Sequence, residues 1–180
     1  FRGNEIQGKT IGIVGYGRIG KKLNKYLKSL DCKIKVYDPL IKQKSRKIDF
    51  VNSLSLIFKN CDIITLNLTL NKNTTGLIDK RYLNILKKNQ ILINTSRGKI
   101  VDEDLIIKKI KQNKFFYTTD VISDEFKDNL HKNKLLRLSN KSSNLIVTPH
   151  IAGLTIESQS KSLNFIVEEL NFFKKKFLLS

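Results

Sequence analysis

Short apolar segments alternate with amphipathic segments along this chain. The apolar segments are rich in β-branched residues, and they lie at residues 10–15, 33–37, 62–67, 90–95, 115–120 and 145–148. Short apolar runs that end at polar or glycine residues are typical of buried strands. Between them, apolar residues recur three or four positions apart at residues 20–30, 54–58, 80–88 and 102–111, which indicates helices packed by one face. Strands that alternate with helices predict an α/β fold, a doubly wound parallel sheet of six strands with helices on both faces.

The last part of the chain has a different pattern. From about residue 155 to residue 177 apolar residues recur on one face of a long predicted helix. Residues 123–143 are polar and show no period, so we expect a long loop there. We therefore expect one domain over residues 1–180, with its sheet core at about 9–154 and a C-terminal helix at about 155–178.

A glycine motif follows the first predicted strand and opens the first predicted helix. It reads Gly15-Tyr16-Gly17-Arg18-Ile19-Gly20. The first glycine allows a tight turn, the second lets a pyrophosphate approach the backbone, and the third lets the helix pack closely on the strand. Free N–H groups at the helix start would bind the phosphates. A glycine-rich turn that binds nothing is the alternative, but the strand–motif–helix order favours a Rossmann-type dinucleotide site.

An acidic residue, Asp38, ends the second predicted strand about twenty residues after the glycines. A carboxylate at this place accepts both hydroxyls of an adenine ribose and repels a 2′-phosphate, so it favours NAD over NADP. Asp38 also precedes Pro39 and can form a turn. Both interpretations can hold together.

Three residues with catalytic chemistry follow three later strands: Arg97, Glu125 and His150. Because the carboxyl ends of parallel strands open on one crevice, we expect them to converge beside the dinucleotide. A guanidinium can hold a carboxylate, an imidazole can exchange a proton near neutral pH, and a carboxylate can orient that imidazole. Taken singly, they could be a surface ion pair, a solvated acid and a structural histidine.

At this point the chain resembles the D-isomer-specific 2-hydroxyacid dehydrogenases, and especially the phosphoglycerate dehydrogenases. The resemblance runs from about Gly3 to Lys176. It rests on the motif above and on GKTIGI at 8–13, YDP at 37–39, TTGLI at 74–78, GKIVDE at 98–103 and PHIAG at 149–153.

The resemblance implies an NAD-dependent enzyme in which Arg97 binds the substrate, His150 is the acid/base and Glu125 is its partner. It also implies a set of residues that contact the cofactor: Gly15, Gly17, Arg18, Ile19, Gly20, Asp38, Leu68, Thr95, Ser96, Arg97, Asp120, His150 and Gly153. Asp120 would meet the nicotinamide carboxamide. The chain departs from the family at Asn67 and Thr69, where His and Pro are usual.

The resemblance also implies a partner domain. The family's substrate domain comes mainly from residues before this region, and this chain, which starts at Phe1 and contains no Met, begins at the hinge. We therefore expect a fragment that binds NAD but turns over poorly alone. The substrate would be a small 2-hydroxy or 2-keto acid, with phosphoglycerate favoured, and the family implies a homodimer.

Composition adds a charge that needs an explanation. The formal net charge is +18, but the lysines are spread along the whole chain, and Asn and Ile are abundant with them. We interpret this as compositional drift and expect no nucleic-acid partner. No apolar run has the length of a membrane span and no leader is visible, so we expect a cytoplasmic protein without a membrane partner. Cys32 and Cys61 are expected to be buried thiols, and no metal site is expected.

Two other function classes remain open from the sequence. The first is a non-catalytic NAD-sensing or partner-binding module of the same fold, against which the presence of all three candidate catalytic residues argues. The second is a basic nucleic-acid binder, which predicts strongly salt-dependent binding.

Overall fold

The computed structural model of this chain describes residues 3–42, 45–125 and 132–177. It forms two compact units, Phe1–Val147 and Thr148–Ser180. The strands of the first unit are β1 (Thr10–Val14), β2 (Lys33–Tyr37), β3 (Asp49–Phe50), β4 (Ile63–Leu66), β5 (Ile91–Asn94), β6 (Phe116–Thr119) and β7 (Leu145–Val147). Its helices are α1 (Arg18–Lys28), α2 (Leu54–Asn60), α3 (Lys80–Leu83), the short 3-10 helix η1 (Gly98–Ile100), α4 (Glu103–Lys111) and α5 (Lys134–Ser139). The second unit contains α6 (Ile156–Phe177), which confirms the predicted long helix.

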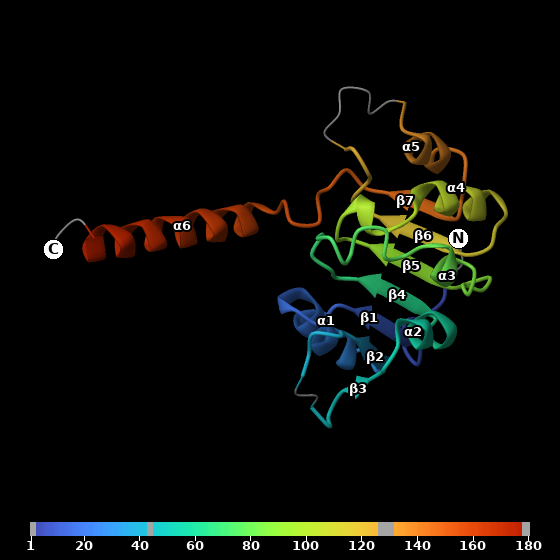
Figure 1. The fold of residues 1–180 in the computed structure, drawn as a ribbon, viewed down its shortest axis with the longest axis horizontal. Helices are drawn as coiled ribbons and strands as arrows, with labels where there is room; N and C mark the ends of the chain where they lie inside the picture. The colour runs from blue at the N-terminus through green and yellow to red at the C-terminus, as the bar shows by residue number, and fades with distance from the viewer. Residues whose placement is uncertain (1–2, 43–44, 126–131, 178–180) are drawn as a thin grey trace. The chain divides into compact units, whose positions relative to one another are not determined.

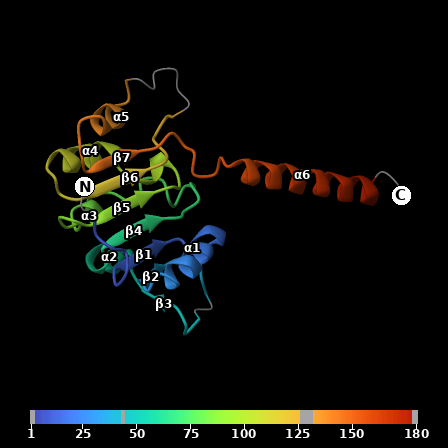
Figure 2. The same cartoon turned by 180° about the vertical axis from the view of Figure 1, so that it is seen from behind.

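The strands form one parallel sheet in the order β3-β2-β1-β4-β5-β6-β7. This order runs from bottom to top in Figure 1, and Figure 2 shows it from behind. Both β2 and β4 pair with β1, so the strand order reverses there and opens a crevice at the carboxyl ends. The predicted Rossmann-type doubly wound sheet is confirmed.

The predicted count of six strands is wrong by one. The additional strand, β3, has only two residues, which is too short for an alternating pattern to show in the sequence. It pairs with β2, where Lys35 lies opposite Asp49 and their side chains form an ion pair at 2.8 Å. A strand of this length is therefore defined by its neighbour rather than by its own residues.

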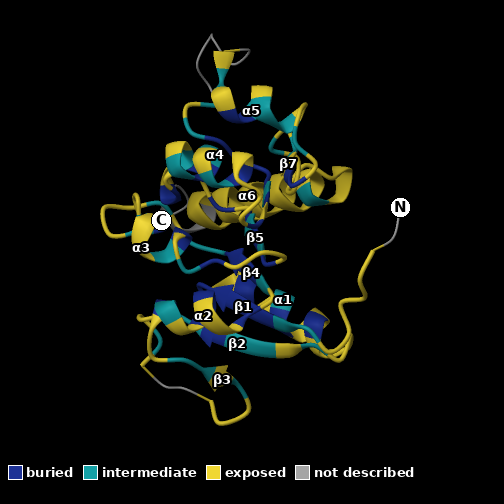
Figure 3. Cartoon of the chain, turned by 90° about the vertical axis from the view of Figure 1, so that its right-hand side faces the viewer, coloured by how far each residue is buried: buried dark blue, intermediate teal, exposed yellow. Residues whose placement is uncertain are grey.

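The sheet carries a separate apolar core on each face. The larger core joins strand residues such as Ile64, Leu92 and Tyr117 to α2, α3, α4 and α5. The smaller core holds Ile11, Ile13, Tyr16, Leu27 and Val36, and it lies between α1 and strands β1 and β2. Figure 3 shows the buried strands β1 and β4 between these helices. Helices thus cover both faces, as predicted.

On the face of the sheet that carries α1, helices cover only some of the strands. In β6 and β7 the residues that face α4 and α5, Tyr117 and Leu145, are buried, whereas the alternate residues Phe116 and Ile146 are 42% and 57% exposed. This is the two-residue period of a strand with one face covered. Within the described residues of the first unit, α1 is the helix on this side, and it contacts β1 and β2.

Several element ends differ from the predictions. The helix predicted at 80–88 covers only Lys80–Leu83, and Asp79 caps it by accepting the backbone N–H of Arg81. The helix predicted at 54–58 extends to Asn60. The segment predicted to be a loop contains α5, whose start is fixed by the side chain of Asn133. Residues 126–131 of that segment lie outside the described residues.

The two cysteines differ from each other. Cys61 is buried, and burial raises the pKa of its thiol to about 12. Cys32 is only half-buried, because it lies in the turn that leads into β2, so the prediction of two buried thiols is wrong for Cys32. None of the helices in the described ranges is long and apolar enough to cross a membrane.

Candidate cofactor and substrate site

The glycine loop lies between β1 and α1, at the carboxyl end of the sheet. Gly15 has φ of +91°, and a Cβ there would overlap the carbonyl oxygen of Asn67, so both its conformation and its surroundings require glycine. A Cβ at Gly20 would overlap the carbonyl oxygen of Gly15 and would lie 3.3 Å from the side chain of Ile13 in β1, so the start of α1 packs closely on both the loop and the strand. Gly17 caps α1 and is exposed, and a Cβ there would meet nothing within 4 Å. The first turn of α1 is thus open to an anion.

Asp38 lies just past β2, beside this loop. Its Oδ2 atom accepts the backbone N–H of Tyr16 at 2.8 Å, and its Oδ1 atom accepts the backbone N–H of Leu40 at 2.9 Å. The second bond is the predicted turn before Leu40, and the first fixes the carboxylate against the glycine loop. Because a carboxylate oxygen can accept more than one hydrogen bond, both oxygens keep capacity for hydroxyl groups.

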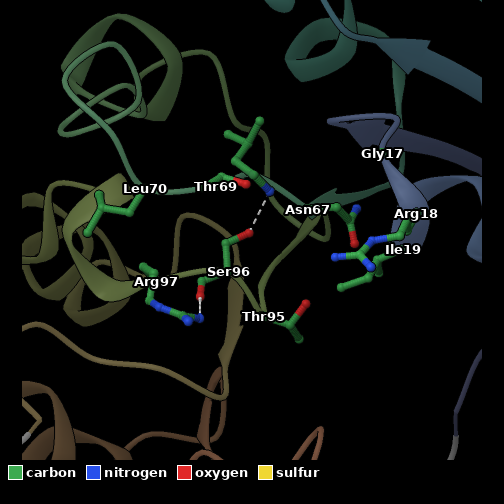
Figure 4. A pocket seen from close by; sticks show the side chains of 10 residues that line it. Gly17, Arg18, Ile19, Asn67, Thr69, Leu70, Thr95, Ser96 and Arg97 are labelled. Carbon is green, nitrogen blue, oxygen red and sulfur yellow. Dashed lines mark hydrogen bonds between the residues drawn. The ribbon is translucent and has the colours of Figure 1, made fainter. Parts of the chain in front are cut away.

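A cleft of about 410 Å³ opens where the strand order reverses. Its lining residues come from the start of α1 and from the segments after β4 and β5: Gly17, Arg18, Ile19, Asn67, Leu68, Thr69, Leu70, Thr95, Ser96 and Arg97. Figure 4 shows Arg18 and Ile19 on one side of this cleft and Leu70 and Arg97 on the other. Seven of the predicted cofactor residues line it: Gly17, Arg18, Ile19, Leu68, Thr95, Ser96 and Arg97.

Ser96 ties two walls of the cleft together. Its buried hydroxyl donates to the carbonyl oxygen of Leu66 at 2.7 Å and accepts the backbone N–H of Leu68 at 2.8 Å. The backbone N–H of Ser96 donates to Oδ1 of Asn94 at 3.0 Å. Ser96 therefore holds the segment after β4 against the segment after β5 (Figure 4).

Arg97 is exposed at the junction of two hollows. Its Nη1 atom donates to the carbonyl oxygen of Ser96 at 2.6 Å, and its own carbonyl oxygen accepts the side-chain amide of Asn94 at 3.0 Å. The role of Asn94 is missing from the sequence predictions. A fully buried asparagine at the end of an apolar strand is the signal that could have revealed it.

A second hollow, of about 300 Å³, adjoins the first. It is lined by Leu70, Arg97, Gly98, Lys99, Ile122, Ser123, Asp124 and Glu125. The structure thus brings the predicted catalytic residues Arg97 and Glu125 to one hollow, and Arg97 also lines the first cleft. Asp120 is buried at the end of β6, where its backbone N–H donates to the carbonyl oxygen of Asn94 at 3.1 Å.

The segment that carries Glu125 is packed against the start of α4. Glu103 accepts the backbone N–H of Ser123 at 2.7 Å. Burial raises the pKa of the Glu103 carboxyl, and the hydrogen bonds from Ser123 offset part of that rise. Asp124 has φ of +58°, a conformation that few non-glycine residues adopt.

The predicted site residues His150 and Gly153 belong to the second unit, whereas the cleft and the hollow above belong to the first. His150 is half-buried and has φ of +55°, and its backbone N–H donates to the carbonyl oxygen of Thr148 at 3.0 Å. In the described ranges no group of three or more His, Cys, Asp or Glu residues could hold a metal ion.

The sequence matches one family model. Residues 1–152 match the NAD binding domain of the D-isomer specific 2-hydroxyacid dehydrogenases. The erythronate-4-phosphate dehydrogenase of Wigglesworthia glossinidia brevipalpis is 40% identical over 174 residues, which cover 93% of this chain and 43% of that protein. The D-3-phosphoglycerate dehydrogenase of Methanocaldococcus jannaschii is 33% identical over 175 residues, which cover 94% of this chain and 32% of that protein.

A solved structure gives the same result for the fold. The structure of D-2-hydroxyisocaproate dehydrogenase matches with a TM-score of 0.90 at 29% identity, over 98% of this chain and 56% of that one. The chain therefore spans between about a third and just over half of the length of these proteins. Its sheet order, its glycine loop and the family match agree: the chain belongs to the D-isomer specific 2-hydroxyacid dehydrogenase family, as an NAD-binding domain of that family.

Proposed function

We propose that this chain is the cofactor half of an enzyme that transfers a hydride between NAD(H) and a D-2-hydroxy acid/2-keto acid pair. The observation that carries the proposal is the position of Arg97. It lines the cleft beside the glycine loop and also the hollow that contains Glu125. A cation at this junction can hold a substrate carboxylate next to a bound dinucleotide.

The residues of the glycine loop and Asp38 fit NAD. The exposed start of α1 would hold the pyrophosphate, and the fixed carboxylate of Asp38 would accept the hydroxyls of the adenine ribose. When bound, NADH supplies the hydride. Ile19, which is 67% exposed, and Leu68 give the cleft apolar surface beside these polar groups.

In the proposed reduction, Arg97 binds the keto acid through its carboxylate and polarises the carbonyl group. His150 gives a proton to the carbonyl oxygen as the carbon receives the hydride, so the keto acid gains one hydride and one proton. Glu125 orients the imidazole and stabilises its charged form before the transfer. Oxidation of the hydroxy acid follows the same steps in reverse, with neutral His150 as the base.

We further propose a phosphorylated acid as the substrate. Two relatives support this choice, since one is a D-3-phosphoglycerate dehydrogenase and the other an erythronate-4-phosphate dehydrogenase. The hydroxyisocaproate dehydrogenase shows that the same fold also serves an apolar substrate.

The test is a substrate panel with the full-length protein and NADH. The panel contains 3-phosphohydroxypyruvate, 2-oxo-3-hydroxy-4-phosphobutanoate and 4-methyl-2-oxopentanoate. We expect turnover with a phosphorylated acid, and we expect Arg97→Ala to lower kcat/KM by about 100-fold or more, since it removes the group that polarises the carbonyl. Arg137→Ala, on α5 and outside both hollows, should have wild-type kinetics.

Two outcomes would contradict the proposal. Wild-type kcat/KM in Arg97→Ala would remove the assigned role of Arg97. NADH binding without turnover of any 2-keto acid would favour the NAD-sensing module instead.

A further inference from the structure

Two residues of η1 and the first residue of α4 hold the segment that precedes Glu125. A Cβ at Gly98 would overlap the backbone between Ile122 and Ser123, so this segment passes directly over the glycine. Glu103 accepts the backbone N–H of Ser123 at 2.7 Å. Lys99 lies 3.6 Å from Oδ1 of Asp124, measured from its Nζ atom. Each contact joins parts of the chain about twenty residues apart or more.

The geometry of the held segment needs such support. Asp124 has a left-handed backbone, with φ of +58°, immediately before Glu125. A conformation of this kind costs free energy in a residue with a Cβ, and it persists where the surroundings fix it. Glu125 itself is half-buried, and its Oε2 atom accepts the backbone N–H of Ile122 at 3.5 Å. The direction of the Glu125 side chain therefore depends on the path of residues 122–124.

Stabilisation of the start of α4 does not by itself explain the position of Glu103. Asp102 already caps α4, by accepting the backbone N–H of Leu105 at 2.9 Å. An acidic residue in the first turn of a helix is favourable, but Asp104 serves that purpose while it remains exposed. Glu103 instead gives up part of its hydration to reach Ser123. Burial of a carboxylate is unfavourable unless hydrogen bonds compensate for it.

We infer that Glu103 is a positioning residue: by holding the amide of Ser123 it directs Glu125 into the hollow that contains Arg97. This inference rests on the proposed role of Glu125 as the partner of His150. Without the bond, residues 122–124 gain freedom and Glu125 spends less time in its working position. The proposed enzyme then keeps its cofactor site and loses part of its control over the imidazole.

This role predicts a change in the pH profile. Reduction of a keto acid needs protonated His150, so its kcat/KM falls at alkaline pH. A carboxylate beside an imidazolium favours the charged form, so a misplaced Glu125 moves this fall to lower pH. The charged neighbours of Glu125 in its hollow are Arg97, Lys99 and Asp124, while Glu103 faces Asp104, Asp124 and Tyr117.

The experiment compares Glu103→Ala, Glu103→Gln, Asp104→Ala and Glu125→Gln in the full-length protein. The readouts are the pH profile of kcat/KM for reduction of 3-phosphohydroxypyruvate or the better keto acid of the panel, the Kd for NADH, and amide hydrogen exchange at Ser123. Glu103→Gln keeps the accepting oxygen. Asp104→Ala removes a charge from the same helical turn, where the ion pair with Lys134 at 3.6 Å is exposed.

We expect Glu103→Ala to move the alkaline limb of the profile to lower pH, in the same direction as Glu125→Gln, and to speed exchange at Ser123 at least tenfold. Glu103→Gln and Asp104→Ala should both follow the wild type, and NADH affinity should stay within threefold in all four. If Glu103→Ala has the wild-type pH profile while Glu125→Gln has a shifted one, the positioning role of Glu103 is overturned and the proposed function is not. Unchanged exchange at Ser123 would also overturn it.

Different outcomes would contradict the proposed function itself. If Glu125→Gln leaves the profile unchanged, or if no keto acid is turned over, the role given to Glu125 is wrong. Exchange at Ser123 then still decides whether Glu103 holds the segment.

Discussion

Asp38 is the residue on which the proposed preference for NAD depends. Two backbone amides hold its carboxylate, from Tyr16 in the glycine loop and from Leu40. A carboxylate fixed in this way cannot turn aside when a 2′-phosphate approaches. The two backbone hydrogen bonds therefore keep the negative charge where it repels the phosphate. The turn expected from the sequence is present in the bond from Leu40, and the ribose-accepting role of the same carboxylate stays a prediction.

Replacement of Asp38 by Asn tests this preference. In the wild type we expect the Kd for NADPH to exceed the Kd for NADH. In Asp38→Asn the ratio of the first Kd to the second should fall by about tenfold, because the side chain keeps its size and loses the charge that repels the phosphate. Titration of both cofactors by fluorescence measures the ratio. Asp104→Asn, at an exposed acid on α4, is the matched control. Equal Kd values for both cofactors in the wild type would refute the assignment.

At the scale of elements, the segments after β4 and β5 are joined at Ser96. Its hydroxyl donates to the carbonyl oxygen of Leu66 and accepts the backbone N–H of Leu68, which lines the cleft. The path of the segment after β4 is thereby coupled to the path of the segment after β5.

Ser96→Ala would leave both backbone groups without their partner. A buried donor or acceptor that loses its hydrogen bond costs about 1–3 kcal/mol, so the free energy of unfolding should fall by this amount. Urea unfolding measures the loss. Ser29→Ala is the control, since that hydroxyl donates to the carbonyl oxygen of Tyr26 at an exposed helix end and should cost little. A loss for Ser96→Ala no larger than for Ser29→Ala would show that the joint is unimportant.

The sequence predicts the parts of this site whose signal is local. Strand residues, the glycine loop and Asp38 are defined by spacing within about thirty residues, and the structure places them as predicted. The strand β3 and the helix α5 are too short to show a period. Contacts such as Glu103 with Ser123 join side chain to backbone across the fold, and nothing in the spacing of either residue indicates them.

At the scale of the whole molecule, the net charge of +18 is carried by lysines on many elements. In the proposed chemistry this charge serves only to attract anionic substrates. The absence of a nucleic-acid partner and the homodimer both stay predictions. Band shifts with duplex DNA at physiological salt would check the first, and sedimentation equilibrium would check the second.

The stability of the first unit should respond to the titration of Glu103. Burial raises the pKa of this carboxyl above its ordinary value of 4.5, so the folded state binds the proton more tightly than the unfolded state does. Its contribution to stability is then complete below pH 4.5 and is lost as the pH rises through the raised pKa.

Glu103→Gln removes this titration and keeps the hydrogen bond. We therefore expect the variant to gain stability over the wild type as the pH rises from 4 to 8, with little difference at the acidic end. Urea unfolding across this range measures the difference between the two proteins. A difference that is constant with pH would contradict the expectation.

The left-handed backbones of Asp124 and His150 have a consequence for how this protein could change under selection. Glycine adopts φ near +55° without the penalty that a Cβ brings, so both positions offer an easy gain in heat resistance. At position 150 that gain would remove the proposed acid, and at position 124 it would free the backbone before Glu125. A library sorted for thermal survival alone should therefore accumulate glycine at these two positions, whereas a library sorted for turnover should keep them.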